Sequence, residues 1–119
     1  MNPRLRSALS LIAIVLVVGG ETEVWRAWSG DRVGSQMAAL AAPGDIQMVT
    51  SDTCPFCVKA RAWFNEHGVA FSECSIERDA DCAARFRAYM SPGTPLLFVR
   101  GQPQVGFDPQ RVAKALGSS

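Results

Sequence analysis

Apolar and polar positions follow two different periods in the second half of the chain, and the changes of period predict its elements. An apolar run predicts a strand over residues 45–51. Apolar residues then recur at helical spacing and predict a helix over residues 58–67. This helix ends at His67, the only histidine, because a cation-capable residue followed by glycine is typical of a helix C-terminus. Alternation returns in residues 69–76 and predicts a second strand.

The remaining pattern predicts a helix, a hairpin and a last helix. Helical spacing extends over residues 79–90 and is broken by a Ser-Pro-Gly sequence. A fully apolar run predicts a strand over residues 96–99, followed by a turn over residues 100–103 and a returning edge strand over residues 104–106. The pair Asp108-Pro109 then predicts a helix start, with an N-cap acid before a proline at the first helical position.

The order of these elements is β-α-β-α-β-β-α, which indicates an α/β fold. Two strands joined through a crossover helix form a parallel pair, and the hairpin adds antiparallel strands. We therefore expect a mixed four-stranded sheet with helices on both faces, spanning a domain over residues 45–119.

The N-terminal segment has a different pattern. Arg4 and Arg6 precede an uncharged, largely apolar run, so residues 1–20 resemble an export signal peptide. An uncleaved membrane anchor is the alternative, because Trp25 and Trp28 follow where interfacial aromatic residues would lie. Both interpretations place the rest of the chain outside the cytoplasm, and we expect a bacterial periplasmic protein, either soluble or anchored in the inner membrane. Residues 21–44 are interpreted as a connector with a short helix near its end.

Composition narrows the range of functions. The chain has 119 residues, 48% of them hydrophobic, and a formal net charge of +1. This length suits one folded domain, and the absence of a basic excess argues against a nucleic-acid partner.

The candidate chemistry lies in Cys54-Pro55-Phe56-Cys57, where the first strand gives way to the first helix. The first thiol then lies at a helix N-terminus, where unpaired N–H groups and the helix dipole favour the thiolate. The second thiol lies one turn later and is close enough to form a disulfide with it. This arrangement indicates thiol–disulfide exchange, although a Cys-x-x-Cys pair also occurs in metal sites.

Two further motifs give this pair a family context. The sequence contains Gly93-Thr94-Pro95 before the third strand and Gly106-Phe107-Asp108 at the start of the last helix. With the cysteine pair, these motifs resemble the glutaredoxin branch of the thioredoxin-fold family in order and spacing. The resemblance covers residues 45–117.

The resemblance implies a role for each motif. Cys54 would attack a disulfide and Cys57 would resolve the mixed disulfide. Pro95 would be a cis proline beside the cysteines, and Thr94 would pair through its backbone with a bound thiol peptide. The backbone of Gly106 and Phe107, with the Asp108 carboxylate, would bind the far end of a glutathione.

Glutathione is a candidate co-substrate, and no bound cofactor or metal is expected. The family places a lysine shortly before the first cysteine, whereas this chain has Asp52 there. The family also carries a paired glycine before the last helix, and Val105 occupies the first of those positions.

The second cysteine pair, Cys74 and Cys82, lies at the end of a predicted strand and at the start of the next helix. In an oxidising compartment we expect a structural disulfide between them. Two unrelated core cysteines, or a relay pair that exchanges with Cys54 and Cys57, are the alternatives.

These observations predict a glutaredoxin-type thiol–disulfide oxidoreductase that acts on protein or glutathione mixed disulfides. Its expected partners are client disulfides or glutathione, an electron donor or acceptor, and the membrane if residues 1–20 are retained. The alternatives are a copper, zinc or iron–sulfur module that uses the same cysteines, and an interaction domain without catalytic activity.

Overall fold

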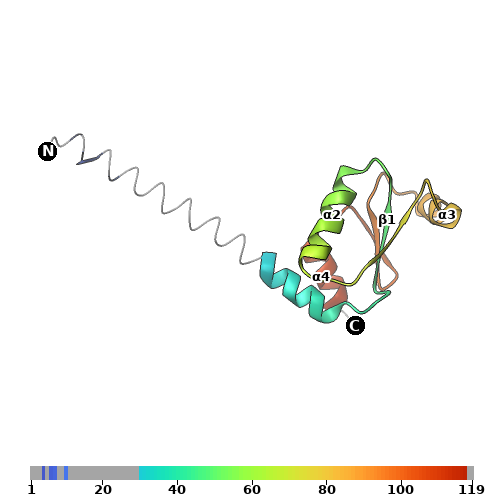
Figure 1. Cartoon of the computed structure of the whole chain (residues 1–119), viewed down its shortest axis with the longest axis horizontal. Coiled ribbons are helices and arrows are strands. Elements are labelled where there is room, and N and C mark those ends of the chain that lie inside the picture. The colour runs from blue at the N-terminus through green and yellow to red at the C-terminus, as the bar shows by residue number, and fades with distance from the viewer. Residues whose placement is uncertain (1–3, 5, 8–9, 11–29, 118–119) are drawn as a thin grey trace. The chain divides into compact units, whose positions relative to one another are not determined.

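A computed structural model of the whole chain describes residues 4, 6, 7, 10 and 30–117. The predicted signal or anchor therefore lies almost wholly outside the described residues. Among the residues that are described, none belongs to a helix long and apolar enough to cross a membrane. The chain divides into two compact units, Met1–Arg32 and Val33–Ser119. The second unit carries the four cysteines and contains the sheet with its helices (Figure 1).

The second unit has the predicted order of elements. After a helical segment that ends at residue 40, the elements follow one another through short connections. They are β1 (Ile46–Thr50), α2 (Pro55–Glu66), β2 (Ser72–Ser75), α3 (Ala80–Ala88), β3 (Leu96–Val99), β4 (Gln102–Val105) and α4 (Pro109–Gly117).

The strands form one mixed sheet in the order β2-β1-β3-β4. β1 runs parallel to β2, with Val49 opposite Cys74, and antiparallel to β3. β3 and β4 form the antiparallel hairpin. The predicted α/β fold with a mixed four-stranded sheet is confirmed.

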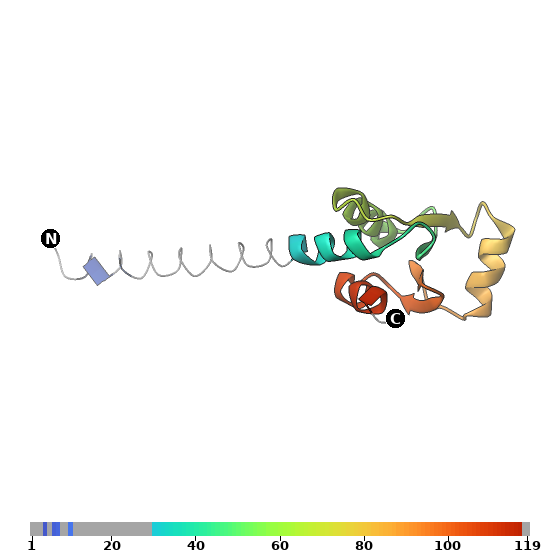
Figure 2. The same ribbon diagram turned by 90° about the horizontal axis from the view of Figure 1, so that it is seen from below.

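Helices cover both faces of this sheet, α2 and α4 on one side and α3 on the other (Figures 1 and 2). Alternation along β3 shows how the sequence divides between them. Leu97 and Val99 face the larger core with α2 and α4, whereas Leu96 and Phe98 face a smaller core with α3. Because side chains alternate across a strand, this fully apolar strand is buried on both faces.

The helical segment before β1 belongs to the larger core. Met37 is fully buried there, and Val33 packs against the same cluster. Gly34 lies against the His67 ring, so close that a Cβ atom at position 34 would overlap it. Val33, Gly34 and Met37, which fall in the stretch interpreted as a connector, thus contribute to the packing of the domain.

The predicted start of the second strand was wrong, and hydrogen bonding explains the difference. The second strand begins at Ser72 because Val69 still belongs to the end of α2: its N–H donates to the Phe64 carbonyl oxygen. Gly68, at φ 66°, donates to Asn65, so the helix ends in a Schellman motif with His67 as its C-cap.

The predicted turn between the last two strands was too long. The observed turn consists of Arg100 and Gly101, both with positive φ. Two-residue hairpin turns of this kind match the twist of the strands that they join. β4 therefore starts at Gln102 and includes Pro103, which is tolerated because β4 is an edge strand.

Candidate active site

Cys54 is placed by the start of α2. It is the N-cap residue with an extended backbone, and Pro55 follows in the first helical turn. Its Sγ atom accepts a hydrogen bond from the Cys57 N–H at 3.1 Å. A sulfur at this position receives an unpaired helix N–H and the positive end of the helix dipole, so its thiolate is favoured.

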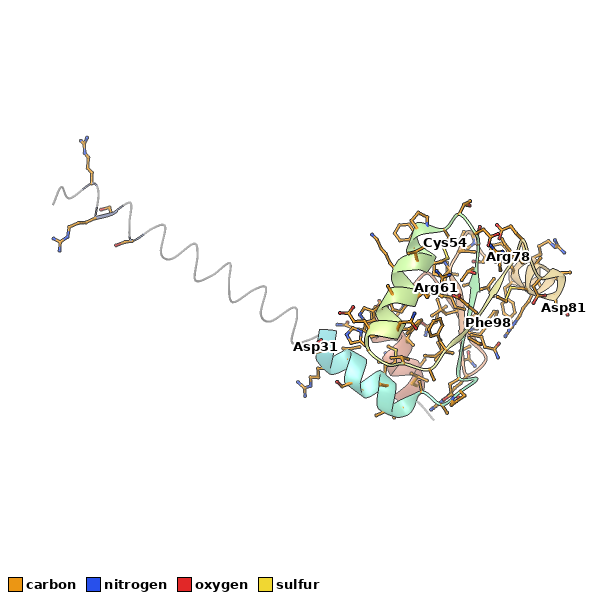
Figure 3. All side chains as sticks on the ribbon, viewed as in Figure 1. Asp31, Cys54, Arg61, Arg78, Asp81 and Phe98 are labelled. Atoms are coloured by element: carbon orange, nitrogen blue, oxygen red, sulfur yellow. A yellow bond between two sulfur atoms is a disulfide. The ribbon has the colours of Figure 1, made fainter. Side chains whose placement is uncertain are left out.

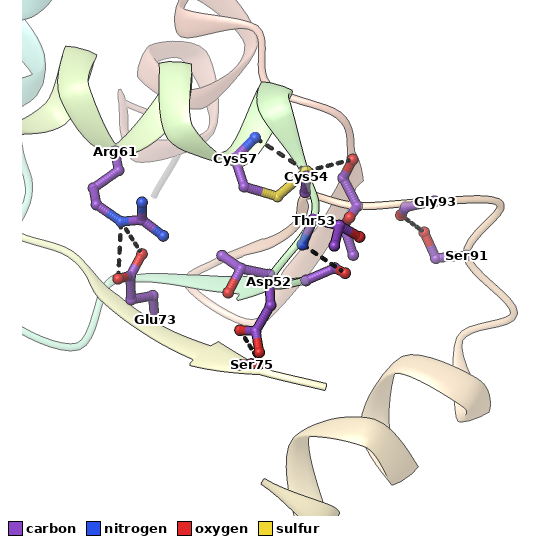
Figure 4. The surroundings of a disulfide bond; sticks show 12 residues. Asp52, Thr53, Cys54, Cys57, Arg61, Glu73, Ser75, Ser91 and Gly93 are labelled. Carbon is purple, nitrogen blue, oxygen red and sulfur yellow. Dashed lines mark hydrogen bonds and ion pairs between the residues drawn. A yellow bond between two sulfur atoms is a disulfide. The ribbon is translucent and has the colours of Figure 1, made fainter. Parts of the chain in front are cut away.

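Cys54 and Cys57 form a disulfide, with Cα atoms 5.3 Å apart (Figure 4). Cys54 is 8% exposed and Cys57 only 1%. The more exposed sulfur is also the one at the helix N-terminus. Access and thiolate stabilisation therefore favour the same atom, Cys54 Sγ, as nucleophile.

The loop before β3 closes the other side of this sulfur. The Thr94–Pro95 peptide bond is cis, as the family resemblance implies, and the Thr94 carbonyl oxygen lies 3.4 Å from Cys54 Sγ. The Gly106 N–H donates to the Pro95 carbonyl oxygen at 2.9 Å. This bond joins the end of β4 to the loop beside the cysteines.

A largely apolar groove extends from this point. Its walls come from the start of α2, the loop before β3 and the end of β4. The lining residues are Phe56, Lys59, Thr94, Pro95, Gly106 and Phe107. The groove therefore contains the predicted Thr94-Pro95 and Gly106-Phe107 pairs beside the cysteine motif.

Comparison with known proteins agrees with this geometry. The sequence model of the glutaredoxin family matches residues 46–104. A probable glutaredoxin of Synechocystis sp. is 34% identical over 71 residues, which cover 58% of this chain and 81% of that protein. The chain belongs to the glutaredoxin family. It is a thiol–disulfide oxidoreductase.

Further relatives support the same assignment. Glutaredoxin-1 of Rhizophagus irregularis is 27% identical over 92 residues, covering 73% of this chain and 90% of that protein. Among solved structures, the thioredoxin-like protein BC3987 superposes with a TM-score of 0.52 at 27% identity, covering 59% of this chain and 97% of that one. Wheat glutaredoxin, at 17% identity, shares the fold with a TM-score of 0.51 and coverages of 73% and 92%.

Two groove residues of this glutaredoxin were missed by the sequence analysis. Phe56 is 65% exposed, although it stands between the two cysteines, and the Lys59 ammonium lies 5.7 Å from the centre of its ring. Lys59 thus places a positive charge in the groove. Its position one turn after Phe56 on a helix was the available signal.

The remaining predicted groove residues have structural partners. The Phe107 ring packs edge-on against Trp63 and Phe64, so its side chain anchors the loop to the core. Asp108 accepts from the Gln110 N–H at 3.0 Å and pairs with Arg111 at 3.7 Å. Asp108 caps α4 as predicted from its sequence, and it does not line the groove.

Cys54 also lines a second, polar cavity, together with residues from the end of β1, from α2, from β2 and from the loop after β2. Arg61 binds the Glu73 carboxylate at 2.9 Å (Figure 4). Arg78, labelled in Figure 3, binds Asp52 at 3.2 Å. The acid that replaces the family lysine is therefore paired with a guanidinium from a distant part of the sequence.

Glu77 lies beside this cavity with an exposed carboxylate. A hydrogen bond from the Ser51 hydroxyl holds the pKa of Glu77 below its usual range, with further help from the Asp52 N–H and the Ser75 hydroxyl. No local pattern indicates this contact, because residues 51 and 77 are distant in the sequence and come close only in the folded domain.

Cys74 and Cys82 also form a disulfide, with Cα atoms 6.1 Å apart, which joins the end of β2 to the first turn of α3. Cys82 is buried in the smaller core. Among the residues that the structure describes, no three His, Cys, Asp or Glu side chains are arranged to hold a metal ion.

Proposed function

We propose that this glutaredoxin catalyses thiol–disulfide exchange, in either direction, with two classes of substrate. They are disulfides of client proteins and mixed disulfides with glutathione, and glutathione is the co-substrate. One observation carries the proposal. Cys54, the less buried cysteine of the pair, has its sulfur at a helix N-terminus and lies beside a largely apolar groove.

The reductive direction proceeds in two exchanges. The Cys54 thiolate attacks one sulfur of the client disulfide, and the other client sulfur leaves as a thiolate that takes up a proton. The Cys57 sulfur, as thiolate, then attacks Cys54 Sγ, which releases the second client thiolate and forms the Cys54–Cys57 disulfide. Two electrons pass to the client. A thiol donor must then supply two electrons to the Cys54–Cys57 disulfide to reduce it again.

The groove supports a peptide-like substrate. The Thr94 backbone lies beside Cys54, where an extended thiol peptide would pair with it as an added strand. Phe56 and Pro95 offer apolar contacts, and Lys59 offers a positive charge to a carboxylate. Glutathione has both the extended backbone and the carboxylates that this combination suits.

The compartment and partners follow from the N-terminal sequence. We place the domain outside the cytoplasm, in a bacterial periplasm, with residues 1–20 as a cleaved signal or a membrane anchor. An electron donor or acceptor in that compartment would complete the cycle. Cell fractionation with N-terminal sequencing of the mature protein tests this placement, and a full-length cytoplasmic protein would contradict it.

Two single variants test the substrate classes. Cys54→Ser is expected to abolish reduction of both insulin disulfides and a glutathionylated peptide, because the attacking sulfur is lost. Cys57→Ser is expected to lose insulin reduction but to keep peptide deglutathionylation, because a second glutathione can resolve the mixed disulfide. Retention of insulin reduction with no deglutathionylation in the unmodified protein would rule out glutathione as co-substrate.

A further inference from the structure

The turn that leads into Cys54 is fastened by one carboxylate from another part of the chain. The Cys54 N–H donates to the Ser51 carbonyl oxygen at 3.3 Å, so residues 51–54 form a turn between β1 and α2. One oxygen of Glu77 accepts from the Ser51 hydroxyl at 2.6 Å, and the other accepts from the Asp52 N–H at 3.1 Å. Glu77 therefore bridges the first two residues of this turn.

Glu77 lies in the loop between β2 and α3, and hydrogen bonds and a disulfide constrain this loop. The Ser75 hydroxyl lies 3.0 Å from the Glu77 carboxylate, and the Glu77 N–H donates back to Ser75 Oγ at 3.3 Å. The Ile76 N–H donates to the Thr50 carbonyl oxygen at 2.9 Å. The Cys74–Cys82 disulfide closes the loop that contains these residues, so the loop cannot separate from the end of β2.

The position of the turn determines how well the reactive sulfur is placed. Cys54 Sγ has the Cys57 N–H at 3.1 Å on one side and the Thr94 carbonyl oxygen at 3.4 Å on the other. A shift of the turn would lengthen the first contact, which stabilises the thiolate, and would alter the angle at which a disulfide approaches the sulfur.

We propose that Glu77 is a positioning residue for thiol–disulfide exchange, and that the Cys74–Cys82 disulfide keeps Glu77 in place. This inference rests on the proposed function, in which Cys54 carries out thiol–disulfide exchange. It assigns the second cysteine pair an indirect role at the active site, without any exchange of electrons between the two pairs.

A negative charge near Cys54 disfavours its thiolate, whereas correct positioning of the turn favours it. The two effects of Glu77 on the Cys54 thiolate therefore have opposite signs, which makes a test possible. Removal of a nearby carboxylate charge favours the Cys54 thiolate, whereas loss of the turn's acceptor disfavours it. Glu73 lines the same cavity as Cys54 but binds Arg61 and has no hydrogen bond to the turn. Glu73→Gln is therefore the matched control for the charge removed in Glu77→Gln.

The experiment measures alkylation of Cys54 by iodoacetamide at pH 7, in a Cys57→Ser background that leaves Cys54 as a lone thiol and Cys74–Cys82 intact. Glu77→Gln is expected to slow alkylation by about two- to fivefold, the effect of weakening one hydrogen bond. Ser51→Ala, which removes the same bond without a change of charge, is expected to slow it by a similar factor. Glu73→Gln is expected to leave the rate unchanged or to raise it.

Equal changes in Glu77→Gln and Glu73→Gln, or an unchanged rate in Ser51→Ala, would overturn the positioning role. Alkylation requires no disulfide substrate, so this result is independent of whether the protein acts on glutathione or on protein disulfides.

The role of the second disulfide is tested in the same assay. In a background with Cys74→Ser and Cys82→Ser, the Glu77→Gln substitution is expected to change the rate by a smaller factor, because Glu77 is no longer held against the turn. The same factor in both backgrounds would show that the disulfide does not position Glu77.

Discussion

Cys54 has two roles that depend on the same atom. Its sulfur is the N-cap acceptor of α2, and in the proposed function it is also the attacking group. A helix start needs an acceptor for its unpaired N–H groups, so the capping role links Cys54 to the stability of α2 as well as to the proposed chemistry.

The capping role leads to a stability prediction that is separate from activity. Cys54→Ser and Cys54→Ala both remove the disulfide to Cys57, but serine keeps a capping oxygen. Cys54→Ser is expected to be more stable than Cys54→Ala by about 1 kcal/mol, the usual cost of losing an N-cap. Urea unfolding of the two variants measures the difference, and equal midpoints would argue against a capping role for residue 54.

Gly34 allows the helical segment before β1 to lie against the end of α2. A Cβ atom at position 34 would overlap the His67 ring, whose Nδ1 is held 2.8 Å from the Trp63 carbonyl oxygen. Gly34→Ala is expected to destabilise the domain by about 1–3 kcal/mol, the usual cost of overpacking.

Gly117→Ala serves as its control, because nothing lies within 4 Å of the added atom there. Thermal unfolding should show a lowered midpoint for Gly34→Ala only. A midpoint equal to that of the control would mean that this segment does not pack against α2 in solution.

At the scale of elements, the loop between β2 and α3 links sheet stability to pH. The Glu77 pKa is lowered, chiefly by the Ser51 hydroxyl. Glu77 therefore contributes stability at pH values above the usual glutamate range. That contribution is lost as the pH falls through the lowered pKa of the folded state.

The unmodified protein is thus expected to lose more stability than Glu77→Gln between pH 7 and strongly acidic pH. Urea midpoints across this range provide the measurement. Parallel curves for the two proteins would show that the hydrogen bonds to Glu77 do not favour its ionised form.

The Cys74–Cys82 disulfide constrains the same loop in the unfolded chain. Closing a loop with a sequence separation of 8 is expected to stabilise the domain by about 2–3 kcal/mol on the chain-entropy account. The variant with Cys74→Ser and Cys82→Ser should lose this amount in chemical unfolding without reductant. An unchanged unfolding midpoint would show that the two cysteines are not joined in the native protein.

Sequence patterns predicted the elements well where local chemistry decides them. The strand over residues 96–99 and the α4 start at Asp108-Pro109 follow from apolar runs and capping residues, which act over a few positions. The start of β2 was misplaced because a helix-capping bond retains Val69, and such a bond competes with strand pairing.

Contacts between distant segments were beyond the reach of these patterns. The cysteine pair and the proline beside it were identified from motifs. Arg78 on Asp52 and Glu77 on the turn depend on how the end of β1 and the loop after β2 come together. Neither residue has a local signature, because a charged residue on a loop is ordinarily solvated.

At the scale of the whole molecule, the reactive sulfur lies between two different surfaces. On one side is the apolar groove that contains Phe56, Lys59 and Pro95, and on the other is the polar cavity with paired charges. The groove is suited to receive the substrate, and on the other side Arg78 pairs with Asp52 of the turn that carries Cys54. The two cores, one on each face of the sheet, hold these surfaces at the same end of β1.

The proposed function depends most directly on Cys54 as the attacking residue. The decisive measurement is mass mapping of the Cys57→Ser protein after incubation with oxidised glutathione or a disulfide-bonded peptide. Without Cys57 the mixed disulfide cannot resolve within the protein, so the adduct is expected to accumulate on Cys54 alone. The absence of any adduct on Cys54, or an adduct on Cys74 or Cys82 instead, would contradict the account.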